Sequence, residues 1–189
     1  MPELGPDLVE HFYGVLAILA IAAIVVIGGL RFLAIGSDGA LDAYAALART
    51  LQPRAIWAAW VVALLATAGS LYFSEIAKFT PCTLCWYQRV AMYPFVVLLG
   101  VAAIRRTSVP TGALLLAAIG AAIAAYHVAL EWIPTLPSAA CAATTPCTDV
   151  WFRAFGIFSL PTLALVAFLS ILTLLLVRDP DEADDRRYR

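Results

Sequence analysis

Charged residues are scarce in this protein. They make up 13% of its 189 residues, whereas apolar residues make up 63%. Because a soluble domain is about half apolar and about a quarter charged, most of this surface cannot face water. The formal net charge of −1 leaves no basic excess with which to bind nucleic acid. The composition therefore excludes a soluble domain and a nucleic-acid-binding protein, and it indicates an integral membrane protein in a lipid bilayer.

The sequence also lacks the features of a membrane β-barrel and of a cleaved secretory signal. No segment alternates apolar and polar residues as a barrel strand does, so the spans are expected to be helices. The first apolar run follows Glu3, Asp7 and Glu10 instead of the basic residues of a signal peptide, and no A-x-A-like cleavage site stands out. We therefore expect this run to be a retained membrane helix.

What the sequence does contain is a series of apolar runs without charge. About 20 such residues cross a hydrocarbon core of about 30 Å. The runs are Phe12–Leu30, Ala55–Ser74, Val90–Ile104, Thr111–Leu130 and Ala154–Val177. They predict an all-α integral membrane protein with five spans.

Smaller features refine this prediction. Residues 37–52, between the first two runs, are expected to form a short interfacial helix capped by Ser37 or Asp38. Prolines are expected to kink two helices, and glycines are expected to be small packing residues within the spans. These positions are Pro94, Pro161, Gly69, Gly112 and Gly120.

The distribution of Lys and Arg predicts the orientation of the chain. With the N-terminus outside, nine of the twelve basic residues fall on the cytoplasmic side, and only Lys78, Arg89 and Arg153 fall outside. The N-terminus is therefore expected outside and the C-terminus inside. The two loops that carry the four cysteines are then extracytoplasmic, where disulfides persist.

Two of the cysteines lie in the stretch TPCTLCWYQR, which begins at Thr80. Cys82 and Cys85 form a C-x-x-C pair, and Trp86 stands where a haem-attachment motif requires histidine. A zinc site made from both cysteine pairs and a set of inert structural disulfides are alternatives. A bridge across C-x-x-C closes so small a loop that it adds little stability, so the spacing favours a redox-active pair.

Arg89 follows Cys85 by four residues, so the two share one helix face if the helix begins near Cys82 or Thr83. The arginine falls at the outer membrane boundary, where it either snorkels to lipid headgroups or binds the polar end of a lipid-soluble ligand. A quinone fits the second description. The helix N-terminus and the guanidinium are expected to lower the pKa of the Cys85 thiol, which suits an electron donor.

The second pair, Cys141 and Cys147, forms C-x5-C in a loop marked by Pro134 and Pro137. Such a loop is expected to be mobile, and its pair either staples the loop or relays thiol–disulfide exchange from a soluble protein. His127, near the external end of the fourth run, either makes an interhelical hydrogen bond or contacts a quinone head.

Several stretches together resemble the DsbB family of disulfide-bond formation proteins, in its compact BdbC-like branch. PCTLCWYQR matches the family signature P-C-x-L-C-x-x-Q/E-R, and YHVALEWIP and GIFSLPTLALVAF are similar to other family segments. The resemblance implies a four-helix membrane bundle in the bacterial cytoplasmic membrane. It also implies reoxidation of a DsbA-like thioredoxin-fold protein, with electrons passed to ubiquinone or menaquinone and no metal.

The resemblance also implies roles for individual residues. Cys82 and Cys85 correspond to the quinone-coupled disulfide, with Cys85 and Arg89 beside the quinone. Cys141 and Cys147 correspond to the disulfide that meets the DsbA-like partner, with Cys141 the expected site of the mixed disulfide. His127 matches a histidine near the quinone pocket.

The same resemblance divides the chain. Residues 1–54 would hold an extra helix (about 12–33) and a cytoplasmic linker, and residues 179–189 a cytoplasmic tail. Residues 55–178 would form the DsbB-like domain, with spans of about 55–74, 85–104, 111–131 and 156–177. Two alternatives stay open: an enzyme resembling vitamin K epoxide reductase, which also couples thiols to quinones, and a membrane scaffold with structural disulfides.

Overall fold

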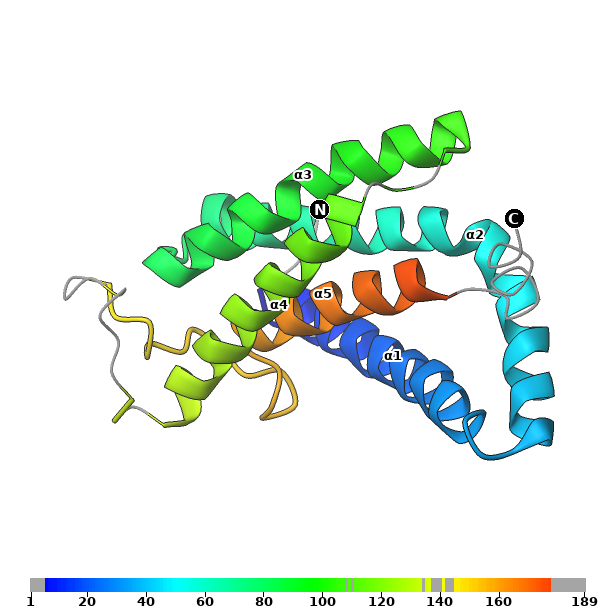
Figure 1. Ribbon diagram of the computed structural model, residues 1–189. Coiled ribbons are helices and arrows are strands. Elements are labelled where there is room, and N and C mark those ends of the chain that lie inside the picture. Colours follow the sequence, from blue (N-terminus) through cyan, green and yellow to red (C-terminus); the bar gives the residue numbers. More distant parts are fainter. Residues whose placement is uncertain are drawn as a thin grey trace.

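The computed structural model describes residues 6–107, 109, 111–133, 135–136, 141 and 145–177. Its helices are α1 (Pro6–Leu33), α2 (Asp38–Leu71), α3 (Thr83–Arg105), α4 (Thr111–Trp132) and α5 (Leu160–Leu176), with a π-helical turn η1 (Tyr72–Ile76) after α2. The predicted all-α fold with five apolar helices is confirmed (Figure 1). Residues 134, 137–140 and 142–144 of the predicted mobile loop, the predicted cytoplasmic tail 179–189 and residue 178 before it lie outside the described residues.

The first four helices are long and apolar enough to cross a membrane, and α5 is a shorter apolar helix. Large apolar side chains such as Phe12, Leu19 and Val25 of α1 and Val97 of α3 point outward. In water such a surface would aggregate, whereas in a bilayer it is solvated by lipid tails. The protein is therefore a multi-pass membrane protein.

Helices α2 to α5 form a ring in which each packs against the next and α5 closes back onto α2. The centre of the ring is made of Phe95 and Leu99 of α3 and Phe168 and Ile171 of α5, all fully buried among alanines. Helix α1 packs on the outside of this ring, against α2 and α5 (Figure 1). The small alanines let the helices approach closely, which is how membrane helices gain packing energy without a hydrophobic driving force.

Helix α2 differs from the sequence prediction. The expected interfacial helix over residues 37–52 is continuous with the second span, and the two form one bent helix (Figure 1). Pro53 lies inside this helix, where its ring clashes with the carbonyl four residues earlier and no N–H is available for the ladder. A proline therefore bends the helix here without ending it. Ser37 occupies the N-cap position, but its side chain makes no capping hydrogen bond.

Helix α5 also starts later than predicted, at Leu160 and not at 154 or 156. Phe155 and Gly156 have positive φ angles of 52° and 76°, and a short bridge joins Ala154 to Phe158, so these residues form a tight turn. Pro161 then falls in the first turn of α5, where its missing N–H has no helical partner to lose. The predicted kink at Pro161 is therefore wrong, because the proline begins the helix.

The glycines divide into two groups. A Cβ atom at Gly120 would overlap the ring of Phe168, and one at Gly69 would lie 2.6 Å from Cζ of Tyr13, so both are packing glycines as predicted. At Gly112 nothing lies within 4 Å of such an atom, so the prediction of a packing role is wrong there. Gly69 and Gly120 lie where two helices are in contact, whereas Gly112 lies in the first turn of α4, away from both of these contacts.

Candidate active site

The first cysteine pair is held by the start of α3. Cys82 is the N-cap residue, and its Sγ accepts the backbone N–H of Cys85 at 3.4 Å. The prediction that the helix begins near Cys82 or Thr83 is confirmed. Both side chains are free thiols, with Sγ atoms 3.2 Å apart. The disulfide expected between them is therefore not formed in this structure, which holds the pair reduced and within reach of bond formation.

Cys82 is surrounded by hydrogen-bond donors. It is 7% exposed and lies against the thiol of Cys85, the backbone N–H of Cys85 and Nε2 of His127, 3.7 Å away. The hydrogen bond from the Cys85 thiol, helped by His127, holds the pKa of Cys82 well below that of a free thiol, although burial opposes the shift. The sequence assigned the thiolate to Cys85, whereas this arrangement places it on Cys82.

His127, on α4, connects the thiol pair to the second cysteine loop and forms a hydrogen bond with α3. Its Nε2 lies 3.1 Å from the carbonyl oxygen of Cys147, which can only accept a hydrogen bond, so Nε2 carries a proton. Its Nδ1 accepts from the side-chain amide of Gln88 at 3.1 Å. The orientation of the ring is set by α3 and by the second cysteine loop. The interhelical hydrogen bond, one of the two predictions for His127, is present.

Gln88 is a site residue that sequence reasoning missed. It is 7% exposed and holds His127 in the tautomer that points a proton toward Cys82. The signal was available, because Gln88 lies in the quoted signature, one helical turn after Cys85.

The second cysteine pair lies directly beside the first. Cys141 and Cys147 are joined by a disulfide with their Cα atoms 5.8 Å apart. Cys147 is 1% exposed, whereas Cys141 is partly exposed. The sulfurs of Cys82 and Cys147 and a ring nitrogen of His127 all lie within 4.8 Å of one another. A disulfide sulfur thus lies close to a thiolate, as thiol–disulfide exchange requires.

The same three side chains have the spacing of a metal site. Zinc in a protein is held by thiolates and imidazoles. Cys147 has no thiolate to offer while it is bonded to Cys141, so the cluster as it stands suits exchange between sulfurs better than metal binding.

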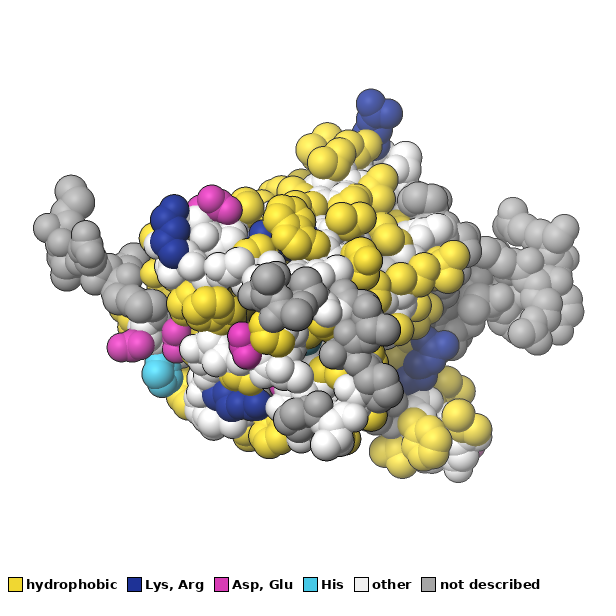
Figure 2. Space-filling view, turned by 90° about the vertical axis from the view of Figure 1, so that its left-hand side faces the viewer, with side chains coloured by type: hydrophobic (Ala, Val, Ile, Leu, Met, Phe, Trp, Pro, Cys, Tyr) yellow, Lys and Arg dark blue, Asp and Glu magenta, His cyan; other side chains and the backbone are white. Residues whose placement is uncertain are grey.

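A cavity of about 370 Å³ opens onto these sulfurs. Cys82, Cys85 and His127 line it together with Glu131 and Asp149. Glu131 is 7% exposed and accepts a hydrogen bond from Ser159. Sequence reasoning missed this carboxylate, although it is the one acidic residue of α4. Figure 2, which views the end of the molecule that carries the cysteines, shows acidic and basic side chains among hydrophobic ones on this face.

A second cavity, of about 240 Å³, lies between α1, α2, α3 and α5. Its lining is mostly Leu, Ala, Val and Phe, with a group of polar residues on α2 and α3 that includes Ser70, Gln88, Arg89 and Tyr93. Cys85 lines both cavities, whereas Cys82 and His127 line only the first among the described residues. His127 therefore lines the cavity of the thiol cluster, and the expected contact between His127 and a quinone stays a prediction.

Arg89 turns toward the protein interior. Its guanidinium donates to the carbonyl oxygen of Ser70 in α2 at 3.1 Å and lies 5.1 Å from the centre of the Trp86 ring. It is half-buried and lines the apolar cavity next to Cys85. Of the two predictions for Arg89, the geometry fits a ligand-facing charge better than a side chain that snorkels to headgroups.

A reactive thiol pair beside a disulfide, on a helical membrane scaffold, defines a membrane disulfide oxidoreductase. The family model described as disulfide bond formation protein DsbB matches residues 52–178, and the chain belongs to this family. The predicted family is thereby confirmed.

Relatives from Bacillus and Oceanobacillus carry names that agree with this family. The chain is 45% identical over 122 residues to probable disulfide formation protein C 1 of Bacillus cereus, covering 64% of this chain and 88% of the relative. It is 45% identical over 119 residues to disulfide bond formation protein C of Bacillus subtilis, covering 62% and 86%. A probable disulfide formation protein of Oceanobacillus iheyensis is 42% identical over 125 residues, covering 64% and 86%. No solved structure matches the chain.

Proposed function

We propose that this protein is a thiol:quinone oxidoreductase that reoxidises a DsbA-like thioredoxin-fold protein and passes the electrons to a membrane quinone. The observation that carries the proposal is the position of Cys85. It lines both the cavity that holds the thiol cluster and the apolar cavity that holds Arg89. Electrons that reach the Cys82–Cys85 pair from one side can therefore leave it on the other.

The apolar cavity has the chemistry of a quinone site. An apolar lining suits a ring and the start of an isoprenoid tail, and Arg89 and Gln88 offer donors for a carbonyl oxygen at the Cys85 side. A quinone held there by Arg89 and Gln88 would supply an acceptor for two electrons and two protons. When the two thiols form their disulfide they release these two electrons and two protons, so the exchange balances. Arg89 would stabilise negative charge next to Cys85 without being able to lose its own proton.

The first exchange takes place at Cys141. A thiolate of the partner attacks Sγ of Cys141, which is the more exposed sulfur of its pair, and the Cys141–Cys147 bond breaks. A mixed disulfide with the partner forms, and Cys147 leaves as a thiolate.

Cys147 then carries the exchange inward. When the first pair is oxidised, the Cys147 thiolate lies within 4.8 Å of Cys82 and can attack it. The Cys82–Cys85 bond breaks, a Cys82–Cys147 bond forms, and Cys85 is released beside Arg89. His127, which contacts both Cys82 and Cys147, stabilises the thiolates at this junction.

The partner's second thiol resolves the mixed disulfide and leaves with its own disulfide formed. The released Cys141 thiolate attacks Cys147, restores the Cys141–Cys147 bond and frees Cys82. The result is a reduced Cys82–Cys85 pair beside an intact second disulfide, which is the arrangement in the structure. The pair then becomes oxidised again at the apolar cavity.

The orientation follows from the positive-inside rule. We place the N-terminus and the cysteine end outside and the C-terminus inside a bacterial cytoplasmic membrane, with nine of the twelve Lys and Arg residues inside. The partly exposed Cys141 would then face exported proteins that acquire disulfides.

The test is anaerobic quinone reduction by the purified protein in detergent, driven by a reduced DsbA-type protein and followed by quinone absorbance. Turnover should occur in the wild type and vanish in Cys85→Ser. The scaffold alternative predicts no turnover with any quinone in a folded sample. An enzyme without a protein partner would turn over with a small dithiol but show no mixed disulfide at Cys141.

A further inference from the structure

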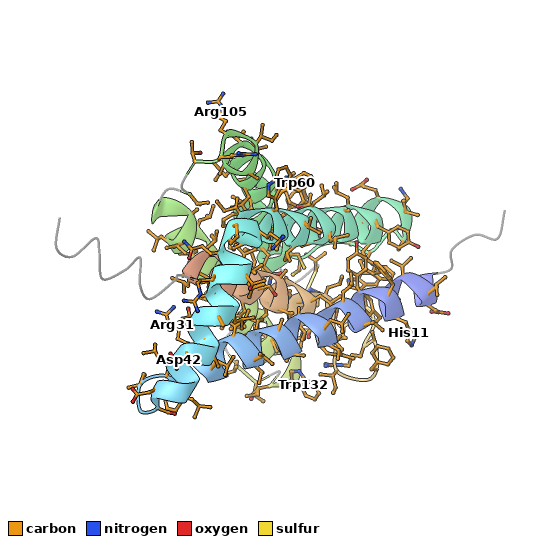
Figure 3. The ribbon with its side chains drawn as sticks, turned by 90° about the vertical axis from the view of Figure 1, so that its right-hand side faces the viewer. His11, Arg31, Asp42, Trp60, Arg105 and Trp132 are labelled. Carbon is orange, nitrogen blue, oxygen red and sulfur yellow. A yellow bond between two sulfur atoms is a disulfide. The ribbon has the colours of Figure 1, made fainter. Side chains whose placement is uncertain are left out.

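Helix α1 lies outside the part of the chain that matches the family, yet it is fastened to the bundle at several points. Near its end, Arg31 donates to the carbonyl oxygen of Leu176 in α5 at 3.0 Å. Near its start, the Tyr13 hydroxyl donates to the carbonyl oxygen of Leu65 in α2 at 3.0 Å. Figure 3 shows α1 running the length of the molecule between His11 and Arg31. The helix therefore has a defined position and is not a loosely attached anchor.

Close contacts along α1 agree with this. Tyr13 packs on Gly69 of α2, where any side chain would collide with its ring. A Cβ atom at Gly14 would lie 2.9 Å from the ring of Phe155, in the turn before α5. Both glycines allow α1 to lie against α2 and the segment that leads into α5.

One face of α1 lines the apolar cavity. Tyr13, Leu16, Ala17 and Ala20 are spaced at intervals of three and four residues, so they form a single stripe on the helix, and all four line the cavity. The opposite face, with Val15, Ile18 and Leu19, is exposed and apolar. The helix thus stands between the cavity and the lipid on the α2–α5 side.

We propose that α1 forms the lipid-side wall of the quinone cavity and that its inward stripe sets the size of ring the cavity accepts. The inference rests on the proposed function. Ala17 and Ala20 are the smallest side chains of the stripe and leave space that a larger residue would fill. Leu16 narrows the same wall. The occupant is a quinone ring, with its carbonyl end toward Cys85 and Arg89 and its apolar edge toward α1.

The test compares Ala20→Phe with Ala22→Phe, which adds the same ring on the exposed face of the same helix. Quinone reduction is measured at several concentrations of a short-tailed quinone. We expect Ala20→Phe to raise the KM for quinone by about tenfold or more, while Ala22→Phe stays within about twofold of wild type. An unchanged KM in Ala20→Phe would overturn the inference.

A second pair of variants covers the case in which Ala20→Phe does not fold. Leu16→Ala enlarges the cavity, and Leu19→Ala removes the same side chain from the lipid face. In Leu16→Ala the ratio of kcat/KM for a two-ring naphthoquinone over a one-ring benzoquinone should rise by about threefold or more. Equal ratios in Leu16→Ala, Leu19→Ala and wild type would overturn the inference.

A separate measurement distinguishes this failure from that of the proposed function. Single-turnover oxidation of the reduced partner is followed in each variant without quinone. If the wild type oxidises the partner but reduces no quinone, the proposed acceptor is wrong and the role of α1 falls with it. If the wild type reduces quinone and the variants behave identically, only the role of α1 is wrong.

Discussion

Cys82 and Cys147 place their sulfur atoms within 4.8 Å of each other, although one is a free thiol and the other is bonded to Cys141. The two residues come from different loops, and His127 contacts both. For exchange between the two cysteine pairs, the sulfurs of Cys82 and Cys147 need to move only a short distance toward each other. This relationship yields predictions about each cysteine.

Cys147→Ser should trap the partner on Cys141. Without Cys147 the disulfide to Cys141 cannot form. The partner is used with its second cysteine replaced by serine and its first cysteine activated as a mixed disulfide with a small aromatic thiol. The Cys141 thiolate then attacks the partner sulfur, the aromatic thiol leaves, and no second thiol of the partner or of the loop resolves the product. Non-reducing electrophoresis and mass spectrometry should show a covalent complex through Cys141. The matched variant Cys141→Ser should give little complex, because Cys147 is 1% exposed. Equal trapping in both variants would contradict the order of exchange.

The lowered pKa of Cys82 should appear in its alkylation by iodoacetamide. Because the group is an acid with a lowered pKa, its thiolate persists as pH falls through neutrality, and its alkylation rate should stay nearly constant from pH 8 to about pH 6. Removing the main donor in Cys85→Ala should raise the pKa and reduce the rate at pH 6 by about tenfold or more.

His127→Ala should act in the same direction with a smaller effect, because its hydrogen bond contributes less than that of Cys85. Mass spectrometry of the Cys82 peptide gives the rate in each variant. Rates that fall tenfold per pH unit already in the wild type would show an ordinary thiol at Cys82.

Arg89→Ala should weaken quinone reduction without slowing partner oxidation. The guanidinium lines the apolar cavity and bonds to the carbonyl oxygen of Ser70, so its loss removes the positive charge next to Cys85. We expect kcat/KM for quinone to fall by about tenfold or more. Arg105→Ala, at the other end of α3, serves as the control and should leave it unchanged (Figure 3). A loss of the same size in both variants would point to a general effect of charge.

Gly120→Ala should destabilise the bundle. The added methyl would overlap the ring of Phe168, which is fully buried and cannot move aside. Overpacking of this kind costs about 1–3 kcal/mol, more than the gain of about 1 kcal/mol that alanine offers in a helix. The Tm in detergent should fall. Gly112→Ala, with open space at the same helix's start, should keep or raise the Tm. A fall in Gly112→Ala alone would reverse this account.

The helices were predictable where hydrophobic run length decides the structure. The errors in helix bounds lie at prolines, whose effect depends on their position in the packed helix. Pro53 bends α2 without breaking it, whereas Pro161 begins α5. The same residue type gives opposite outcomes because the packing of each segment decides whether a helix continues through it. The free thiols of Cys82 and Cys85 were equally beyond prediction, since spacing alone does not state whether a redox pair is reduced or joined by a disulfide.

The sequence by itself determined the membrane environment, the family and the grouping of Cys82, Cys85 and Arg89 at the start of one helix. The membrane environment follows from composition and the grouping from the repeat of an α-helix, which are local properties, and the family follows from the resemblance of PCTLCWYQR to its signature. Only the tertiary structure decided that Cys82 is the sulfur that carries the negative charge and that α1 forms one wall of the apolar cavity. Cys82 meets His127 across 45 residues of sequence, and α1 reaches the cavity across the whole bundle. Such contacts depend on how helices pack. A hydrogen-bond donor lowers the pKa of a thiol, and a side chain closes a cavity, only when folding brings the two groups together.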